Sequence, residues 1–207
     1  MKISYAVTVC NEFEEIKKLV NFLLLNKRED DEIVILFDYN NGTTEVLDFL
    51  REKSVGEKII FYKERFSNHF ADWKNKLTEY CSGDYIFQID ADEIPHKLLM
   101  VNLPIILENN PDHEVYLVPR VNTVEGLTQE HINKWRWNVN EKGWVNWPDY
   151  QTRIIQNSPK IKWQNKVHEQ IIGVSTQGAL PMEEEWCLYH PKHILRQEAQ
   201  NNFYDTL

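Results

Sequence analysis

Short runs of β-branched and aromatic residues alternate with longer stretches of helical periodicity over the first 120 residues of this chain. Such an alternation is typical of a mostly parallel sheet covered by helices. We therefore predict an α/β fold with strands at residues 3–9, 33–37, 58–62, 85–89 and 115–118. Amphipathic helices are expected after each of the first three strands, and Pro104 should divide the helix after the fourth strand into two short pieces.

The pattern changes at about residue 121. Helical periodicity fades there, and short strands are expected at residues 152–156 and 167–172. No stretch rich in Pro, Gly or Ser separates the two parts of the sequence. We predict a single domain over residues 1–207, in which residues 1–120 bind the main ligand and residues 121–207 form a smaller elaboration.

The charge balance restricts the partners of the chain. With 23 Lys and Arg against 32 Asp and Glu, the formal net charge is −9, the wrong sign for a protein that holds nucleic acid by neutralising phosphates. The most apolar uncharged stretch, residues 19–26, is far shorter than the roughly 20 residues of a membrane-spanning helix. The sequence also begins without a signal-peptide pattern, and Cys10, Cys81 and Cys187 are too far apart for a disulfide framework. We expect a cytoplasmic protein with reduced thiols, no transmembrane segment and no nucleic-acid partner.

Acidic residues follow the predicted strands at the edge of the sheet where a ligand would bind. Asp38 follows the second strand, and Asp90 and Asp92 follow the wholly apolar fourth strand. Ligands of open parallel sheets bind beyond the carboxyl ends of the strands, and residues two apart on a strand share one side. Carboxylate oxygens in this arrangement suit Mg²⁺ or Mn²⁺ bound together with phosphates. The alternative is that these acids favour the N-terminus of the next helix or lie in solvent.

Several segments together resemble a known family. They are residues 7–12 (Val-Thr-Val-Cys-Asn-Glu), Asp38, residues 68–75 (Asn-His-Phe-Ala-Asp-Trp-Lys-Asn) and residues 83–93, which end in Asp-Ala-Asp-Glu. In this order and spacing, the first 120 residues are similar to family 2 glycosyltransferases of the GT-A fold, a Rossmann-like α/β arrangement. The later Val167-His168-Glu169 and Tyr189-His190 are similar to elements of relatives that modify bacterial surface sugars.

The resemblance implies transfer of a sugar from a nucleotide diphosphate donor to the hydroxyl of a glycan or another acceptor, with Mn²⁺ or Mg²⁺ on the diphosphate. Family frequency favours a UDP-sugar, bound by the 1–120 half, with the acceptor bound by the 121–207 half. Asp92 would bind the metal, Asp90 would face the ribose or a metal-bound water, and His190 would be the third protein ligand. The resemblance places these residues at the nucleotide: Thr8, Val9, Asn11, Glu12, Asp38, Asp72, Lys74, Asn75 and Ala91.

Glu169 is the candidate general base. An inverting transfer needs a carboxylate that takes the proton of the attacking hydroxyl, and the resemblance gives Glu169 this role, with Asp149 as the second candidate. The alternative for Glu169 is an ordinary ion pair at a strand edge, whereas His168 would orient Glu169 or contact phosphate. Arg153 lies on a short strand that should approach the same crevice, where it would hold a phosphate or form a surface ion pair.

Two other functions fit parts of the sequence. A nucleotidyltransferase would also use a parallel sheet and carboxylate-bound Mg²⁺, but the loop at residues 10–15 is acidic and has no glycine, unlike a phosphate-binding loop. A carbohydrate-binding module without catalysis would bind Ca²⁺ through the acids and sugar rings on tryptophans, although packing is the favoured role for any single one. The candidates are Trp135, Trp137, Trp144 and Trp147.

Overall fold

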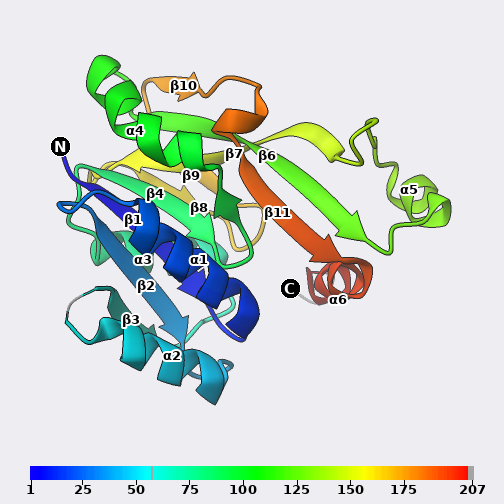
Figure 1. Cartoon of the computed structure of the whole chain (residues 1–207), viewed down its shortest axis with the longest axis horizontal. Helices are drawn as coiled ribbons and strands as arrows, with labels where there is room; N and C mark the ends of the chain where they lie inside the picture. The colour runs from blue at the N-terminus through cyan, green and yellow to red at the C-terminus, as the bar shows by residue number, and fades with distance from the viewer. Residues whose placement is uncertain (57, 205–207) are drawn as a thin grey trace.

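The computed structural model describes residues 1–56 and 58–204. Position 57, in the predicted 1–120 part, and positions 205–207, in the predicted 121–207 part, lie outside the described residues. Within the described ranges, a nine-stranded mixed sheet is covered by helices (Figure 1). Its parallel part has the spatial order β3 (Ile60–Glu64), β2 (Glu32–Asp38), β1 (Ile3–Val9) and β4 (Tyr85–Asp90). The carboxyl ends of these strands therefore lie at one edge of the sheet, as predicted.

The later strands extend the same sheet beyond β4. In β7 (Val145–Gln156) the chain runs antiparallel to β4 and to β6 (Val115–Glu125), and β11 (Leu188–His193) runs parallel to β6. The short strands β5 (Ile94–Pro95) and β10 (Gln177–Ala179) pair with β11 and β6. A separate antiparallel pair consists of β8 (Lys162–Gln164) and β9 (Gln170–Ile172). Both predicted parts of the sequence thus contribute strands to one sheet.

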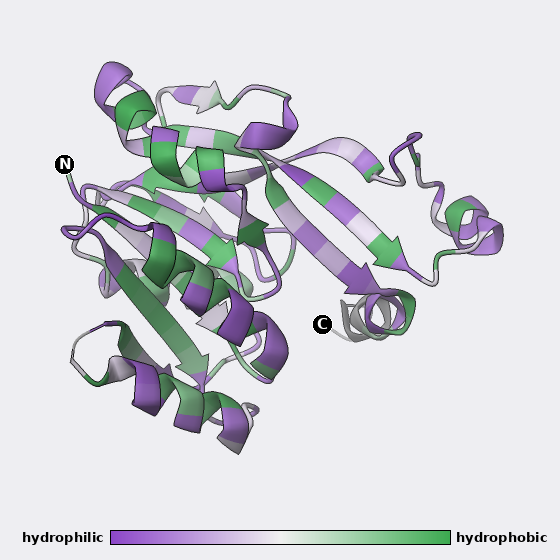
Figure 2. Ribbon diagram, in the orientation of Figure 1, coloured by the Kyte–Doolittle hydropathy of each residue, from purple (hydrophilic) through white to green (hydrophobic). Residues whose placement is uncertain are grey.

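The alternation of side chains along the strands builds a core on each face of the sheet. Tyr5 and Val7 pack on the side of α1 (Phe13–Asn26), α2 (Thr44–Ser54) and α4 (Lys97–Asn109), whereas Ala6 packs on the side of α3 (Phe70–Glu79). The central strands are apolar, and the helices turn polar faces outward (Figure 2). These buried apolar faces contribute most of the folding free energy, because removing apolar area from water is worth about 25 cal/mol per Å².

Two sequence expectations need correction. Pro104 does not divide the fourth helix, because α4 is continuous with Pro104 buried inside it. The loss of one backbone hydrogen bond there is offset by burial of Leu99, Leu103 and Leu107 against the sheet. The fifth predicted strand also does not end at residue 118 but continues to Glu125, since it still pairs with β7 as far as Asn122 and with β11 as far as Glu125.

Strands β6 and β11 extend past the helix-covered part of the sheet (Figure 1). They carry α5 (Gln129–Trp135) and α6 (Ile194–Tyr204) at their ends, and the 3₁₀ helix η1 (Glu184–Trp186) precedes β11. All three cysteines are free, as predicted. Over the ranges that the structure describes, we find no helix with the length and apolar character needed to cross a membrane.

Candidate active site

A cavity of about 1030 Å³ opens at the carboxyl ends of β1, β2 and β4. Its other walls come from β6, β7 and β11, from the loop between β8 and β9, and from the first turns of α6. Strand ends and loops converge at this edge of an open sheet, so polar side chains from distant parts of the sequence meet there.

The acidic segment after β4 rests on buried positive charge. The guanidinium of Arg153 on β7 donates to Oδ2 of Asp90 and to Oε1 of Glu93, both at 2.5 Å. Glu93 is completely buried and also accepts the backbone N–H of Asp90. Burial would raise the pKa of Asp90, but the nearby charges of Arg153 and Lys74 outweigh it and hold the pKa below the usual range. Asp90 is therefore an anion whose position is set by Arg153.

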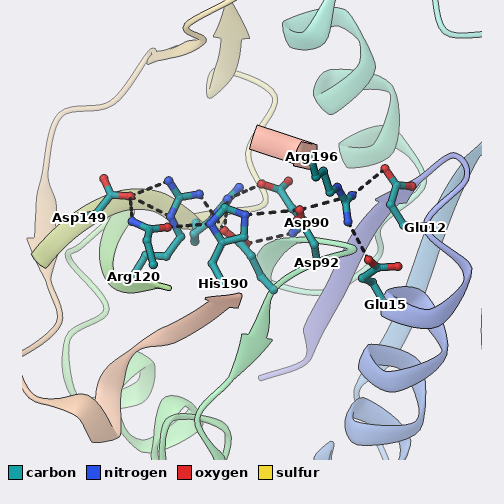
Figure 3. Close-up of polar contacts among 11 residues, drawn as sticks. Glu12, Glu15, Asp90, Asp92, Arg120, Asp149, His190 and Arg196 are labelled. Atoms are coloured by element: carbon teal, nitrogen blue, oxygen red, sulfur yellow. Dashed lines mark hydrogen bonds and ion pairs between the residues drawn. The ribbon is translucent and has the colours of Figure 1, made fainter. Parts of the chain in front are cut away.

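Asp92 lies beside His190 in the wall of the cavity (Figure 3). Nε2 of His190 lies 3.4 Å from Oδ2 of Asp92, while Nδ1 lies 2.7 Å from Oδ1 of Asn122 on the neighbouring strand β6. Burial would raise the pKa of Asp92, but the hydrogen bond and the charge of His190 lower it. Asp92 and His190 are 98 positions apart in the sequence, yet they lie side by side as two potential metal ligands.

Asp149 on β7 is held by donors on three sides. Arg120 donates to its Oδ2 through both Nε and a terminal nitrogen, at 2.9 and 2.6 Å. Asn122 and Gln151 each donate at 2.8 Å, and the other terminal nitrogen of Arg120 lies 3.1 Å from Glu93. Burial would raise the pKa of Asp149, but Arg120 and these hydrogen bonds lower it. A carboxylate with so many donors is a weak base.

The loops after β1 and β2 are organised by their own acids. Glu12 turns back so that Oε2 accepts the backbone N–H groups of Cys10 and Asn11, at 2.8 and 3.0 Å. Asp38 is buried and accepts the backbone N–H groups of Asn40 and Phe66. Burial and the charge of Glu12 raise the pKa of the Cys10 thiol to about 11, so this thiol is protonated and is not a nucleophile at neutral pH.

The sequence pattern predicted a strand over residues 167–172, but only residues 170–172 form one. Glu169 lies instead in the loop between β8 and β9. Its Oε2 lies 3.6 Å from Nζ of Lys74 on α3, and the same Nζ lies 4.5 Å from the centre of the Trp163 ring. His168 precedes it with a left-handed backbone (φ 53°), which is rare for a residue with a side chain. His168, Glu169 and Lys74 all line the cavity.

Comparison with known proteins agrees with this architecture. Residues 4–170 match the family model described as glycosyl transferase family 2, which is most of the chain. The chain belongs to glycosyl transferase family 2. Its sheet and helices have the GT-A fold, so the fold class expected from the sequence is confirmed.

Relatives of this family 2 chain are longer than it is. It is 30% identical over 95 residues to the prophage-derived glycosyltransferase SunS of Bacillus subtilis (strain 168), an alignment that covers 46% of this chain and 21% of SunS. The solved structure of Staphylococcus aureus TarS residues 1–349 has a TM-score of 0.64 at 14% identity, over 92% of this chain and 60% of that one. The same TarS segment with UDP-GlcNAc has a TM-score of 0.62 at 14% identity, over 93% and 59%. The family 2 chain therefore spans less than two thirds of each of these relatives.

Most side chains that the sequence singled out meet in the cavity of the family 2 fold. The residues among them that line it are Thr8, Val9, Asn11, Glu12, Asp38, Lys74, Asp90, Ala91, Asp92, Asp149, Arg153, His168, Glu169 and His190. Asp72 and Asn75 are not brought there. Asp72 is exposed on α3 beside His69, and Asn75 is hydrogen-bonded to the backbone of Trp163. Arg153 contributes to the wall of the cavity with only 3% of its surface exposed, and its guanidinium is bound by the carboxylates of Asp90 and Glu93.

The Asp92–His190 pair fits a divalent cation. Nδ2 of Asn122 donates to the acceptor-only Asp149, so Oδ1 of Asn122 faces His190 and Nδ1 of the ring must carry a proton. Nε2 then faces the Asp92 carboxylate, and the space between these two groups takes either a proton, as in the hydrogen bond that lowers the pKa of Asp92, or a metal ion. In the part of the chain that the structure describes, no three His, Cys, Asp or Glu gather as a metal site. The protein would therefore supply two ligands, as Mg²⁺ and Mn²⁺ sites that use phosphate oxygens do.

Sequence reasoning assigned no role to several polar residues of the site, among them Glu93, Arg120, Asn122 and Arg196. A signal for Arg120 and Asn122 was present, because they are two apart on β6, and Asp149, Gln151 and Arg153 follow one another at steps of two on β7, which pairs with β6. Polar residues at this spacing inside apolar strands indicate one polar face of a strand pair. Nothing in the sequence near Arg196 indicated its place in the cavity.

Proposed function

We propose that the chain is an inverting glycosyltransferase that moves a sugar from a nucleotide diphosphate donor, a UDP-sugar, to an acceptor hydroxyl with the help of Mn²⁺ or Mg²⁺. The observation that carries the proposal is the Asp92–His190 pair, which faces the loop after β1 across one cavity in a GT-A fold. The TarS structure with UDP-GlcNAc supports a uridine nucleotide as the donor.

The nucleotide half of the site is assigned to the ends of β1 and β2. Residues 8–12 and Asp38 form the wall on which the nucleoside would lie, with Ala91 between the two strand-end acids. Glu12 and Asp38 already accept backbone hydrogen bonds, so they hold the loops in shape before the donor arrives. Such preorganisation reduces the entropy that binding must remove.

Asp92 and His190 would hold the metal, with Asp90 beside them. When bound, the metal would neutralise the negative charge of the leaving diphosphate. Arg153 keeps Asp90 ionised, and Asn122 keeps the lone pair of His190 directed at Asp92. The site therefore maintains the charge and the tautomer that a divalent ion requires.

Glu169 is assigned as the general base. In the transfer, the acceptor oxygen forms a bond to the anomeric carbon while the bond from that carbon to the donor phosphate breaks, so the diphosphate leaves with the electron pair. The acceptor proton passes to Glu169. Glu169 has one ion pair, at 3.6 Å to Lys74, whereas Asp149 accepts four hydrogen bonds and has a lowered pKa. This difference favours Glu169 over Asp149.

The acceptor would approach from the part of the cavity formed by residues 121–207. Trp137 lines the cavity and lies 4.6 Å from Trp135, measured between ring centres. Aromatic faces of this kind suit the C–H side of a sugar ring. A carbohydrate-binding module without catalysis would use the same tryptophans but has no need for a nucleotide.

Thermal unfolding with Mn²⁺ and UDP tests the proposal. A ligand that binds only the native state raises the melting temperature, by an amount set by RT ln(1 + [L]/Kd). We expect UDP to raise it only when Mn²⁺ is present, and Asp92→Asn to abolish this increase while leaving the circular dichroism spectrum of the free protein unchanged. Equal stabilisation of Asp92→Asn and wild type would overturn the metal assignment. A protein stabilised by oligosaccharides but by no nucleotide would be a binding module.

A further inference from the structure

Arg196 brings the start of α6 against three carboxylates of the cavity region. One terminal nitrogen lies 2.8 Å from Oε1 of Glu15 on α1. The other lies 3.4 Å from Oε1 of Glu12 and 3.5 Å from Oδ2 of Asp92 (Figure 3). Arg196, Glu12 and Asp92 line the cavity, whereas Glu15 is not part of its wall. A guanidinium thus lies beside the carboxylate that we assign to the metal.

The ion pair between Arg196 and Glu15 can break at little cost in stability. The side chain of Arg196 is 36% exposed and that of Glu15 is 38% exposed, and exposed ion pairs contribute little to stability. By contrast, the side chains of Arg120 and Arg153 are only 17% and 4% exposed, and both bind the completely buried Glu93. Arg196 is therefore the arginine of the cavity that can change partners without leaving a buried charge uncompensated.

A bound metal and diphosphate would change the balance of charge around Arg196. A cation bound at Asp92 would neutralise the carboxylate that now attracts the guanidinium. The cation would also repel the guanidinium directly. The diphosphate supplies new anionic oxygens nearby, and guanidinium groups bind phosphate oxygens through paired N–H donors. In the loaded site the diphosphate would therefore be a more favourable partner for Arg196 than Asp92.

We propose that Arg196 binds the diphosphate of the donor, and that Glu12, Glu15 and Asp92 hold Arg196 near this position until the donor arrives. Exchange of partners would draw α6 onto the donor, so this helix would complete the site after the metal and the nucleotide have bound. The inference rests on the proposed function, because it needs a diphosphate at Asp92.

The alternative is that Arg196 only fastens α6 to α1. The two roles predict opposite changes in nucleotide affinity when Glu15 is removed. If Arg196 only links α6 to α1 through its ion pair with Glu15, removal of either residue should weaken nucleotide binding in the same way. If Arg196 binds the diphosphate, loss of Arg196 should weaken binding, but loss of Glu15 should strengthen it, because Glu15 competes with the diphosphate for the guanidinium.

Isothermal titration calorimetry with two probes, Mn²⁺ alone and UDP in saturating Mn²⁺, tests this. For Arg196→Gln we expect UDP affinity to fall on the order of tenfold, the loss of a charge-assisted hydrogen bond. Its affinity for Mn²⁺ alone should rise about threefold or more, because a cation beside Asp92 is gone. For Glu15→Gln we expect UDP affinity to rise up to about fivefold. Arg196→Lys, which retains the charge, should lie between wild type and Arg196→Gln.

Arg51→Gln is the matched control, because it breaks an exposed arginine–carboxylate pair with Asp48 on α2, outside the cavity wall. It should leave both affinities unchanged. Weaker UDP binding in both Glu15→Gln and Arg196→Gln, or unchanged UDP binding in Arg196→Gln, would overturn the inference while the proposed function stands. Wild-type protein that binds no UDP in the presence of Mn²⁺ would overturn the proposed function, and this inference with it.

Discussion

Oδ1 of Asn122 lies 2.7 Å from Nδ1 of His190, and this contact decides which ring nitrogen faces Asp92. The orientation of the Asn122 amide is itself fixed by Asp149, which accepts from Nδ2 at 2.8 Å. A chain of contacts from β7 through β6 to β11 therefore directs the lone pair of Nε2 toward the assigned metal position. Residues that orient a ligating histidine in this way contribute to metal affinity without touching the metal.

Asn122→Leu should lower the affinity for Mn²⁺, measured calorimetrically in the presence of UDP, by about 10- to 100-fold. If Asn122 acts through His190, the double variant Asn122→Leu/His190→Gln should bind Mn²⁺ no more weakly than His190→Gln alone. Additive losses in the double variant would mean that Asn122 acts on the metal by another route.

Glu169→Gln should lower the turnover number by about 10² to 10⁴, since the amide keeps the shape of the side chain but accepts no proton. UDP affinity should be unchanged, because the carboxylate acts on the acceptor. Glu79→Gln, which breaks the exposed Lys76–Glu79 pair on α3, is the matched control and should retain full turnover. Should Glu169→Gln turn over like wild type, the role of the base would pass to Asp149.

Arg153→Met should destabilise the protein by about 3 to 5 kcal/mol, because it leaves the fully buried Glu93 without its closest cation. Urea denaturation measures this difference. The double variant Arg153→Met/Glu93→Gln should recover part of the loss, since it removes the unpaired charge. A single variant as stable as wild type would show that Arg120 alone is sufficient to neutralise Glu93.

Glu32 should make stability depend on pH. Burial alone would raise its pKa, but hydrogen bonds from Lys2, Ser4 and Ser82 outweigh it and lower the pKa from 4.5 to about 2. A carboxyl whose folded pKa is depressed stabilises the protein above its unfolded pKa, and this contribution is lost as the pH falls toward the folded value. The difference in unfolding free energy between wild type and Glu32→Gln should therefore be constant above about pH 5.5 and shrink between about pH 4.5 and 2. An equal difference at pH 3 and pH 7 would contradict this.

The sequence alone predicted the class of the fold and the edge of the sheet that carries the site. Both follow from local patterns, because strand alternation and helical periodicity arise from backbone geometry within a few residues. Asp90 and Asp92 were found in this way, since residues two apart at a strand end share one side. The expected division at Pro104 was wrong because burial of the helix against the sheet outweighs the local effect of a proline.

The partners of these residues were decided by the tertiary structure. The sequence left Arg153 with two roles, a phosphate ligand or a surface ion pair, and only the pairing of β7 with β4 brings its guanidinium to the carboxylates of Asp90 and Glu93. Arg196 reaches Glu12 across 184 positions, and no local pattern contains that relationship. Such contacts depend on strand order and on where the last helix lies. The physical reason is that a local pattern specifies which face of an element is polar, whereas the packing of whole elements determines which polar faces meet.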